Sequence, residues 1–335
     1  MPIKVSVIIP AYNAEKTIAR TLSSVVTQTL DEVEIIVVIN GTTDNTYEVT
    51  EKVLSNQTRF PWYTILEEEG NVGKARNIGI DRAKGEFLFF LDSDDYIENT
   101  ALEKLYKTAT KDSADIAFCG FRKENSRSEI TFNYDQLFHY YYSPETGMKA
   151  LQDFLVGSIW ICISTGLFKR RIIIQNSIRF SEKYSSGEDQ CFIMYCLYYA
   201  KFVASFNEVL STYFAHSFGL SASNRVFESV YLFEGFVNFL KDNPKKVDRK
   251  AVEKTIYILI YYKIPYLLAR NFYRYAKNRT YTEFLKVKKS NGLLLKKYKM
   301  KLYPKNKHSK FGIYGYFLLR HIPLLFYYYS NKRIE

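Results

Sequence analysis

The chain has 335 residues, of which 47% are hydrophobic and 17% aromatic, so it can bury a substantial core and is not an intrinsically disordered protein. At this length we expect a domain of about 230 residues and a smaller second unit. The formal net charge of +12 is unevenly distributed. Residues 230–335 hold 24 Lys and Arg against 6 Asp and Glu, or +18, which leaves −6 for residues 1–229. The basic character therefore belongs to the C-terminal part of the chain.

The four cysteines, Cys119, Cys162, Cys191 and Cys196, do not have the spacing of a metal-binding motif. We interpret them as reduced core residues of a cytoplasmic protein. The first apolar run, residues 5–9, has neither a basic leader nor a small-residue cleavage site, so we expect no signal peptide.

Short apolar runs alternate with helical periodicity from the N-terminus onward. The first expected strand, residues 4–10, ends in a proline, which cannot donate to a strand ladder. Asn13 lies where it would cap a helix that extends to Val26. A second strand at residues 34–39 and a second helix at residues 45–54 follow.

The same alternation continues over about two thirds of the chain. We expect further strands at residues 63–66, 87–91, 116–121, 158–168, 202–206 and 210–214, and further helices at residues 70–79, 99–110, 144–156 and 190–199. Residues 123–145 show no clear period, and we interpret them as a loop over the site. This order specifies a parallel sheet with helices on both faces. Because the pattern then becomes helical and basic, we predict two domains, residues 1–226 and 227–335.

Three acids, Asp92, Asp94 and Asp95, follow the apolar run at residues 87–91. In open α/β sheets, ligands bind beyond the carboxyl ends of the strands, where these acids would lie. Asp92 and Asp94 can project to the same side of an extended segment and would repel each other unless a cation lay between them. Such oxygen ligands suit Mg²⁺ or Mn²⁺. The alternative is a solvated acidic turn.

Five motifs occur in a fixed order: Val-Ser-Val-Ile-Ile-Pro-Ala-Tyr-Asn at residues 5–13, Asn-x-Gly-x-x-x-Arg-Asn-x-Gly at 71–79, Asp-Ser-Asp-Asp at 92–95, Gly-Glu-Asp at 187–189, and His216. As an ordered set they resemble the family 2 glycosyltransferases, inverting enzymes that use sugar nucleotides. The resemblance covers about residues 3–225. It implies a GT-A fold, a Rossmann-like, mostly parallel sheet flanked by helices, here followed by a helical, basic C-terminal region.

The resemblance also implies roles for individual residues. The implied nucleotide-binding residues are Pro10, Ala11, Tyr12, Asn13, Asn40, Asn71, Gly73, Arg76, Asp92 and Ser93. Asp92 would contact the ribose, and Asp94 would hold the Mn²⁺ or Mg²⁺ that bridges the diphosphate, with His216 completing the metal site. The alternatives are packing within a turn for Tyr12, a solvated helix arginine for Arg76 and a structural role for His216.

A general base is implied at the Glu188-Asp189 pair, and we assign it to Asp189, with Glu188 as the competitor. Both acids also suit the N-terminus of a helix, which would hold whether or not they are catalytic. One departure concerns the end of the second strand. The family often carries two acids there, whereas this chain has Ile39 and Asn40, so recognition of uridine is less secure than metal binding.

The basic C-terminal part contains two apolar, aromatic stretches, residues 256–275 and 311–329. Arg320 and Pro323 oppose a transmembrane span in the second stretch, since a charge at the bilayer centre costs roughly 2.5–3.5 kcal/mol. Between the two stretches, residues 286–310 are strongly basic, which suits an interfacial helix on an anionic membrane. The alternative is a helical bundle or a contact with a second subunit. No nucleic-acid recognition module accompanies the charge.

The expected function is a metal-dependent, inverting transfer of a sugar from a nucleotide sugar, UDP-linked by preference, to a saccharide or lipid-linked saccharide. The expected location is cytoplasmic and peripheral on the inner face of the cell membrane. A homo-oligomer is an alternative role for the C-terminal region. The runner-up function is a non-catalytic glycan- or membrane-binding protein that retains the fold.

Overall fold

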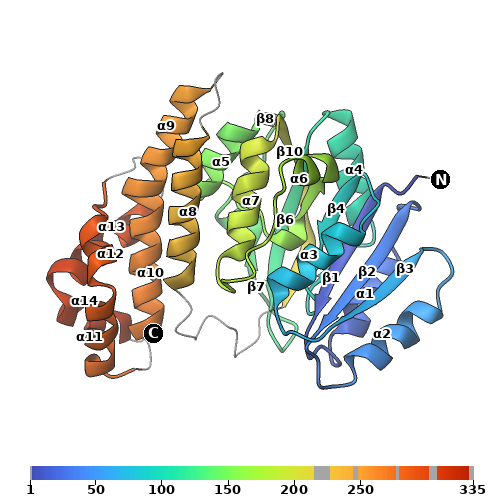
Figure 1. Cartoon of the computed structure of the whole chain (residues 1–335), viewed down its shortest axis with the longest axis horizontal. Helices are drawn as coiled ribbons and strands as arrows, with labels where there is room; N and C mark the ends of the chain where they lie inside the picture. Colours follow the sequence, from blue (N-terminus) through green and yellow to red (C-terminus); the bar gives the residue numbers. More distant parts are fainter. Residues whose placement is uncertain (1, 215–226, 244–247, 277–278, 302–307, 332–335) are drawn as a thin grey trace. The chain divides into compact units, whose positions relative to one another are not determined.

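The structure is a computed structural model, which describes residues 2–214, 227–243, 248–276, 279–301 and 308–331 (Figure 1). The chain divides into two compact units, and a short piece of the middle of the sequence belongs to the second. The units are Met1–Leu151 with Ile159–Ser217, and Gln152–Ser158 with Phe218–Glu335.

The first unit is built on a sheet of ten strands within the described residues. The strands are β1 (Val5–Ala11), β2 (Val33–Asn40), β3 (Trp62–Glu67), β4 (Phe87–Phe90), β5 (Tyr96–Ile97), β6 (Ile116–Glu124), β7 (Ile130–Asn133), β8 (Glu145–Thr146), β9 (Gly166–Lys169) and β10 (Phe202–Phe214). Their order is β3-β2-β1-β4-β9-β6-β10-β5, with β7 on β6 and β8 on β10. The pairs β3–β2, β2–β1, β1–β4 and β6–β10 are parallel, whereas β9 runs antiparallel between β4 and β6. The prediction of a mostly parallel sheet flanked by helices is confirmed.

The helices of this unit connect the strands in the expected alternation. They are α1 (Ile18–Val26), α2 (Thr46–Ser55), α3 (Val72–Arg82), α4 (Ala101–Lys111), α5 (Gly147–Val156), whose second half belongs to the other unit, α6 (Arg170–Gln175) and α7 (Glu188–Tyr199). The crossovers through α1, α2 and α3 keep β1 to β4 parallel, so the carboxyl ends of these strands meet at one edge of the sheet.

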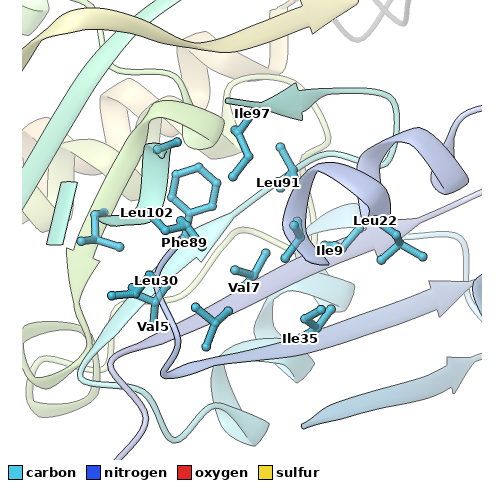
Figure 2. Close-up of a cluster of buried hydrophobic side chains, with 14 of the residues drawn as sticks. Val5, Val7, Ile9, Leu22, Leu30, Ile35, Phe89, Leu91, Ile97 and Leu102 are labelled. Atoms are coloured by element: carbon cyan, nitrogen blue, oxygen red, sulfur yellow. The ribbon is translucent and has the colours of Figure 1, made fainter. Parts of the chain in front are cut away.

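The central strands are buried on both faces, as their unbroken apolar sequences predict. Val7 of β1 lies opposite Ile35 of β2 on one side and Phe89 of β4 on the other. Figure 2 shows these side chains in one cluster with Leu22 of α1 and Leu102 of α4. Burial of an aliphatic or aromatic side chain of this size stabilises the fold by about 1.5–3 kcal/mol. The core thus fixes the edge of the sheet at which β1, β2 and β4 end.

Four local predictions are wrong. The strand expected at residues 158–168 is confined to β9, and a 3-10 turn at Ile163–Thr165 precedes it. Asn13 is not a helix cap, because its backbone is left-handed, with φ of 47°, and α1 begins only at Ile18. The two closing strands expected after residue 202 are one strand, β10, with a bulge between Ser205 and Val209. Part of the loop expected at residues 123–145 is instead the strand β7, paired with the end of β6.

The second unit is helical, as predicted. Its helices are the end of α5, α8 (Glu228–Asp242), α9 (Arg249–Ile258), a π-helical turn (Leu259–Lys263), α10 (Ile264–Ala276), α11 (Tyr281–Ser290), α12 (Gly292–Lys297), α13 (His308–His321) and α14 (Pro323–Asn331). Aromatic rings pack against one another inside this unit. The ring centroid of Phe284, on α11, lies 6.1 Å from that of Phe272, on α10, and 5.9 Å from that of Phe326, on α14. The apolar stretch at residues 311–329 is divided between α13 and α14. In the part of the chain that the structure describes, no helix is long and apolar enough to span a bilayer.

Candidate active site

The acids predicted from the sequence lie directly after β4, in a turn that begins at Asp92. The backbone amide of Asp95 donates to the carbonyl of Asp92 (3.0 Å) and closes the turn. The hydroxyl of Thr21, on α1, lies 2.9 Å from the carbonyl oxygen of Ser93 and 2.7 Å from that of Asp95. With its backbone held in this way, the turn presents Asp92 and Asp94 half-buried at the ligand-binding edge of the sheet.

Asp95 is buried and connects three segments of the site. Its carboxylate accepts hydrogen bonds from the backbone amide of Phe214, at the end of β10 (3.1 Å), and from the hydroxyl of Ser164 (3.3 Å). Burial raises the pKa of Asp95 well above its usual range, and the charges of Asp94 and Asp92 raise it further. Asp95 therefore positions the acidic turn, and Asp92 and Asp94 are its more accessible members.

Arg76, on α3, joins the acidic turn to a second acidic segment. It is 3% exposed, and its Nη2 lies 2.7 Å from Oδ1 of Asp92 while its Nη1 lies 3.2 Å from Oε1 of Glu188. Burial opposes the guanidinium charge, but the carboxylates of Asp92 and Glu188 outweigh it and raise the pKa of Arg76. Its Nε is buried and has no hydrogen-bond partner among the residues that the structure describes. The role of Arg76 in nucleotide binding stays a prediction, since its ion pairs here are with the two carboxylates.

The second acidic segment is the first turn of α7. Gly187 precedes the helix in a left-handed conformation, with φ of 90°, which residues other than glycine adopt only with strain. Glu188 is 8% exposed, and burial, together with the charge of Asp189, raises its pKa to about 7 against the opposing charge of Arg76. Asp189 is half-buried, and burial also raises its pKa, again with Arg76 opposing. As a residue, Asp189 is thus more exposed than Glu188, whose carboxylate is ion-paired with Arg76.

The segment that leads towards α7, residues 180–182, is clamped to α3. The side chain of Asn77 accepts from the backbone amide of Phe180 (2.9 Å) and donates to its carbonyl (3.0 Å). Asn71, which caps α3, donates from its side chain to the carbonyl of Glu182 (2.7 Å). Gly73 lies so close to this segment that a Cβ atom on it would be 2.2 Å from the carbonyl oxygen of Ser181. The clamp gives Asn71 and Gly73 structural roles beside the predicted nucleotide contact, and it uses Asn77, to which the sequence analysis assigned no role.

The residues predicted to line the nucleotide pocket lie at the end of β1. Pro10 and Ala11 are buried within the strand, and Tyr12 beyond it is 57% exposed. The left-handed backbone of Asn13 turns its side chain towards the loop after β2, where its Oδ1 accepts from the amide of Thr43 (2.9 Å). Tyr12 is therefore the exposed flat ring at this end of the strand. A role for these four residues in nucleotide binding stays a prediction.

Asn40 ends β2 and is buried, with its side-chain amide between two backbone groups. When the amide nitrogen faces the carbonyl of Ala11 (3.0 Å) and the oxygen faces the amide of Asn71 (3.2 Å), both are satisfied. This orientation is required because the opposite one would leave two buried polar groups unpaired. Asn40 therefore joins the end of β1 to the cap of α3, at the position predicted to face a nucleobase.

Two residues near the acids were not expected there. Tyr213, in β10, precedes Phe214, whose amide donates to Asp95, and burial together with the charges of Asp95 and Asp94 raises the pKa of Tyr213. Cys162 was predicted to be a core residue but is half-buried, and burial and the charges of Asp189 and Asp95 raise its pKa. The other three cysteines are buried, as predicted, and all four are free thiols. The sequence offered one signal for Tyr213, because it belongs to the last apolar run of the first domain, residues 210–214, whose end was expected near the site.

The predicted metal ligands are placed only in part. Asp94 lies in the acidic turn, whereas His216 falls outside the described residues. Among the residues that the structure describes, no three Asp, Glu, His or Cys side chains gather into a complete metal site. Any cation at Asp94 would have to take further ligands from elsewhere, such as the oxygens of a bound substrate or water.

The sheet order, the acidic turn after β4 and the acids at the start of α7 define the architecture of a GT-A glycosyltransferase. A solved structure with this fold is that of Staphylococcus aureus TarS 1–349 in complex with UDP-GlcNAc, which aligns with a TM-score of 0.65 at 20% identity over 82% of this chain and 81% of that one. The chain belongs to glycosyl transferase family 2, whose model matches residues 6–176. Glu188 and Asp189 lie beyond that match.

Two curated relatives illustrate the range of the family. The putative glycosyltransferase EpsH of Bacillus subtilis (strain 168) is 31% identical over 262 residues, which are 76% of this chain and 74% of EpsH. The poly(ribitol-phosphate) beta-N-acetylglucosaminyltransferase TarP of Staphylococcus aureus (strain N315) is 32% identical over 194 residues, or 56% of each chain. The chain is accordingly a glycosyltransferase, similar to the first relative over most of its length.

Proposed function

We propose that this protein is an inverting, metal-dependent glycosyltransferase that transfers a sugar from a UDP-sugar to a saccharide or lipid-linked saccharide in the synthesis of a polysaccharide, glycolipid or glycoprotein glycan. The observation that carries the proposal is the Arg76 bridge. It holds Asp92 of the acidic turn and Glu188 of the carboxylate pair on one guanidinium, so the donor-side acids and the base candidate belong to one site. A UDP-linked donor is supported by the complex of TarS with UDP-GlcNAc, a protein of the same fold.

In this proposal, Asp189 acts as the general base. It takes the proton of the acceptor hydroxyl while that oxygen attacks the anomeric carbon of the donor. The bond from the anomeric carbon to the diphosphate oxygen breaks on the opposite face, and the nucleoside diphosphate leaves with the bonding electrons. Glu188 is less suited to this role, because its carboxylate is buried and engaged with Arg76.

The acidic turn fits a divalent cation that is shared with a substrate. Asp92 and Asp94 offer oxygen ligands, and their charges raise the pKa of the buried Asp95, a sign of concentrated negative charge. The ion pair with Arg76 offsets the charge of Asp92, so we assign the metal contact to Asp94. Mg²⁺ and Mn²⁺ suit such a partial site, because Mg²⁺ is usually held by one or two carboxylates plus phosphate oxygens. When bound, the ion would neutralise charge on the departing diphosphate.

Replacing Asp94 by alanine should remove the Mn²⁺ dependence of donor binding, because the diphosphate would then face the acidic turn without a cation. Calorimetry of UDP binding with and without Mn²⁺ measures this effect, and affinity in Mn²⁺ should fall to the metal-free value. Asp242→Ala, an exposed carboxylate on α8, is the matched control and should bind as the unmodified protein does. Unchanged affinity and metal dependence in Asp94→Ala would exclude this residue as the ligand.

We also propose that the basic second unit attaches the enzyme to the anionic inner face of the cell membrane. Several large apolar side chains of α13 and α14 are exposed beside the predicted basic stretch: Tyr314, Phe317, Leu324, Leu325, Tyr328 and Tyr329. Exposed apolar patches of this kind mark contacts with membranes or proteins, and a homo-oligomer is the competing explanation.

Full-length protein should sediment with anionic vesicles at low salt and progressively less as salt rises, because charge attraction is screened over about 8 Å at physiological ionic strength. The double variant Leu324→Ser, Leu325→Ser should bind less, whereas Leu137→Ser, at an exposed leucine of the first unit, should not change binding. If the full-length protein does not sediment with anionic vesicles at low salt, the membrane proposal is wrong. A lower mass of the double variant in light scattering would favour the oligomer instead.

A further inference from the structure

A basic pocket of about 440 Å³ lies at the end of β4 that is remote from the acidic turn. It is lined by Lys84, Gly85, Glu86, Lys169, Arg170, Arg171, Ile174 and Gln175. Lys169 of β9 pairs with Phe87, the first residue of β4. The backbone amide of Arg170, which follows Lys169, donates to the carbonyl of Glu86 (2.9 Å). Asp92 is five residues beyond Phe87, about 16 Å along an extended strand. The pocket is therefore separate from the candidate active site.

The charges that line this pocket are unbalanced. Four basic side chains face one carboxylate, that of Glu86, which accepts a hydrogen bond from the hydroxyl of Tyr106 (3.2 Å). Lys169 is only loosely paired, with its Nζ 3.8 Å from a carboxylate oxygen of Asp115. For the other three basic side chains, the described residues supply no ion pair. The pocket thus carries a positive charge that the described part of the protein does not neutralise.

Arg170 is the half-buried arginine of the pocket. Its Nε is buried and has no hydrogen-bond partner within the described residues, which is also true of Arg20 and Arg76. An anion in the pocket, bound by the other nitrogens of the guanidinium, would balance the charge of this side chain.

A second lysine-lined pocket shows how this chain neutralises surface charge elsewhere. It has a volume of about 490 Å³ and lies between α4 and the segment from Tyr141 to Pro144. There, Lys104 is paired with Glu208 (2.5 Å), and Lys107 is paired with Glu103. Two of the three lysines that line this pocket therefore have carboxylate partners, and Lys111 is the one for which the described residues supply none.

We propose that the pocket between β4 and α6 binds a phosphate group, either of a soluble phosphorylated compound or of a phospholipid headgroup. Guanidinium groups bind phosphate oxygens in a fork geometry, and lysines add point charges, so the two arginines and two lysines suit this anion. The volume lies within the usual range for small-molecule sites, about 300–1,000 Å³. This ligand is distinct from the donor diphosphate, which the first unit is proposed to bind at the opposite edge of the sheet.

The test uses the full-length protein and the double variant Lys84→Gln, Arg171→Gln, because both side chains are exposed and can be replaced without disturbing the core. Calorimetry at constant ionic strength should show binding of inorganic phosphate and of glycerol phosphate, weakened about tenfold or more in the variant. The control Lys104→Gln, Lys107→Gln removes two lysine charges at the second pocket and should bind as the unmodified protein does. Arg170→Lys, which keeps the charge but loses the fork, should show an intermediate affinity.

Vesicles containing phosphatidylglycerol distinguish the two sources of phosphate. If the Lys84→Gln, Arg171→Gln variant loses vesicle binding more than the control does, the ligand is a headgroup, whereas loss of glycerol phosphate binding alone indicates a soluble ligand. The proposal is overturned if the unmodified protein binds neither phosphate compound at about 10 mM, or if both double variants lose affinity equally, as diffuse charge attraction would predict. Donor binding at the acidic turn should be unchanged in all of these variants, so the result is independent of the proposed function.

Discussion

Replacing Asp189 by asparagine is expected to lower the rate of sugar transfer by about 10²–10⁴-fold, the usual contribution of a positioned general base. Asparagine keeps the size of the side chain but cannot take the proton of the acceptor hydroxyl. Affinity for the donor should be nearly unchanged, because Asp189 belongs to α7 and the predicted donor residues lie on β1, α3 and the acidic turn. Single-turnover kinetics, with UDP binding by calorimetry, would measure both quantities.

Glu188→Gln is the matched control for this result. Its carboxylate is buried and paired with Arg76 at 3.2 Å, so the substitution should act on stability and donor geometry more than on proton transfer. If Glu188→Gln abolishes transfer at intact donor affinity while Asp189→Asn remains active, the base is Glu188.

If Asp189 is the general base, the direction in which the rate of transfer changes with pH is also defined. Burial raises the pKa of Asp189 above its usual value of 3.8, with Arg76 opposing. A base must be ionised to act, so transfer should fall as pH decreases through this raised pKa and should level off above it. A pH–rate profile without an acidic limb would contradict the role of Asp189 as the base.

Replacing Arg76 by methionine is expected to destabilise the fold by about 3–5 kcal/mol, the usual cost of removing one partner of a buried ion pair. The variant would leave the buried Glu188 carboxylate, and Asp92 beside it, without their cation. The loss should be smaller at acidic pH, because protonated carboxyls no longer require a positive partner. Arg76→Lys should be intermediate, since one ammonium cannot form the same fork with both carboxylates.

Denaturant unfolding of both variants measures this loss, and Lys107→Met provides the control. Lys107 also forms an ion pair, with Glu103 one turn earlier on α4, but its side chain is 73% exposed. Exposed pairs contribute about 0–1 kcal/mol, so Lys107→Met should change stability little. Equal effects of the two substitutions would mean that burial does not strengthen the Arg76 bridge.

The parts of the fold that were predictable have a strong local signal. Continuous apolar runs identify β1, β2 and β4, because strands buried on both faces need apolar side chains at every position. The acidic turn was predictable because its residues are adjacent in sequence and follow such a run. A strand was expected at residues 158–168, but the antiparallel position of β9 between β4 and β6 was not foreseen, since its four residues carry no pairing information of their own.

The internal organisation of the site was less predictable, because it depends on contacts between residues far apart in sequence. Arg76 and Glu188 are 112 residues apart in the sequence, and no local sequence pattern predicts their ion pair. Asn40 was interpreted as a contact for a nucleobase, which stays a prediction, and the contacts of its amide with two backbone segments were not foreseen. Buried polar side chains of this kind are placed by tertiary packing, and periodicity or spacing does not reveal their partners.

The clamp of residues 180–182 on α3 has a consequence for recombining this enzyme with its relatives. Asn71, Gly73 and Asn77 contact that segment through its backbone, so they accept different side chains there but require the same path of the chain. A chimaera that exchanges the region around α7, to alter acceptor choice, would therefore need to keep that path or exchange α3 with it. For this purpose, α3 and the segment that leads into α7 are best exchanged together.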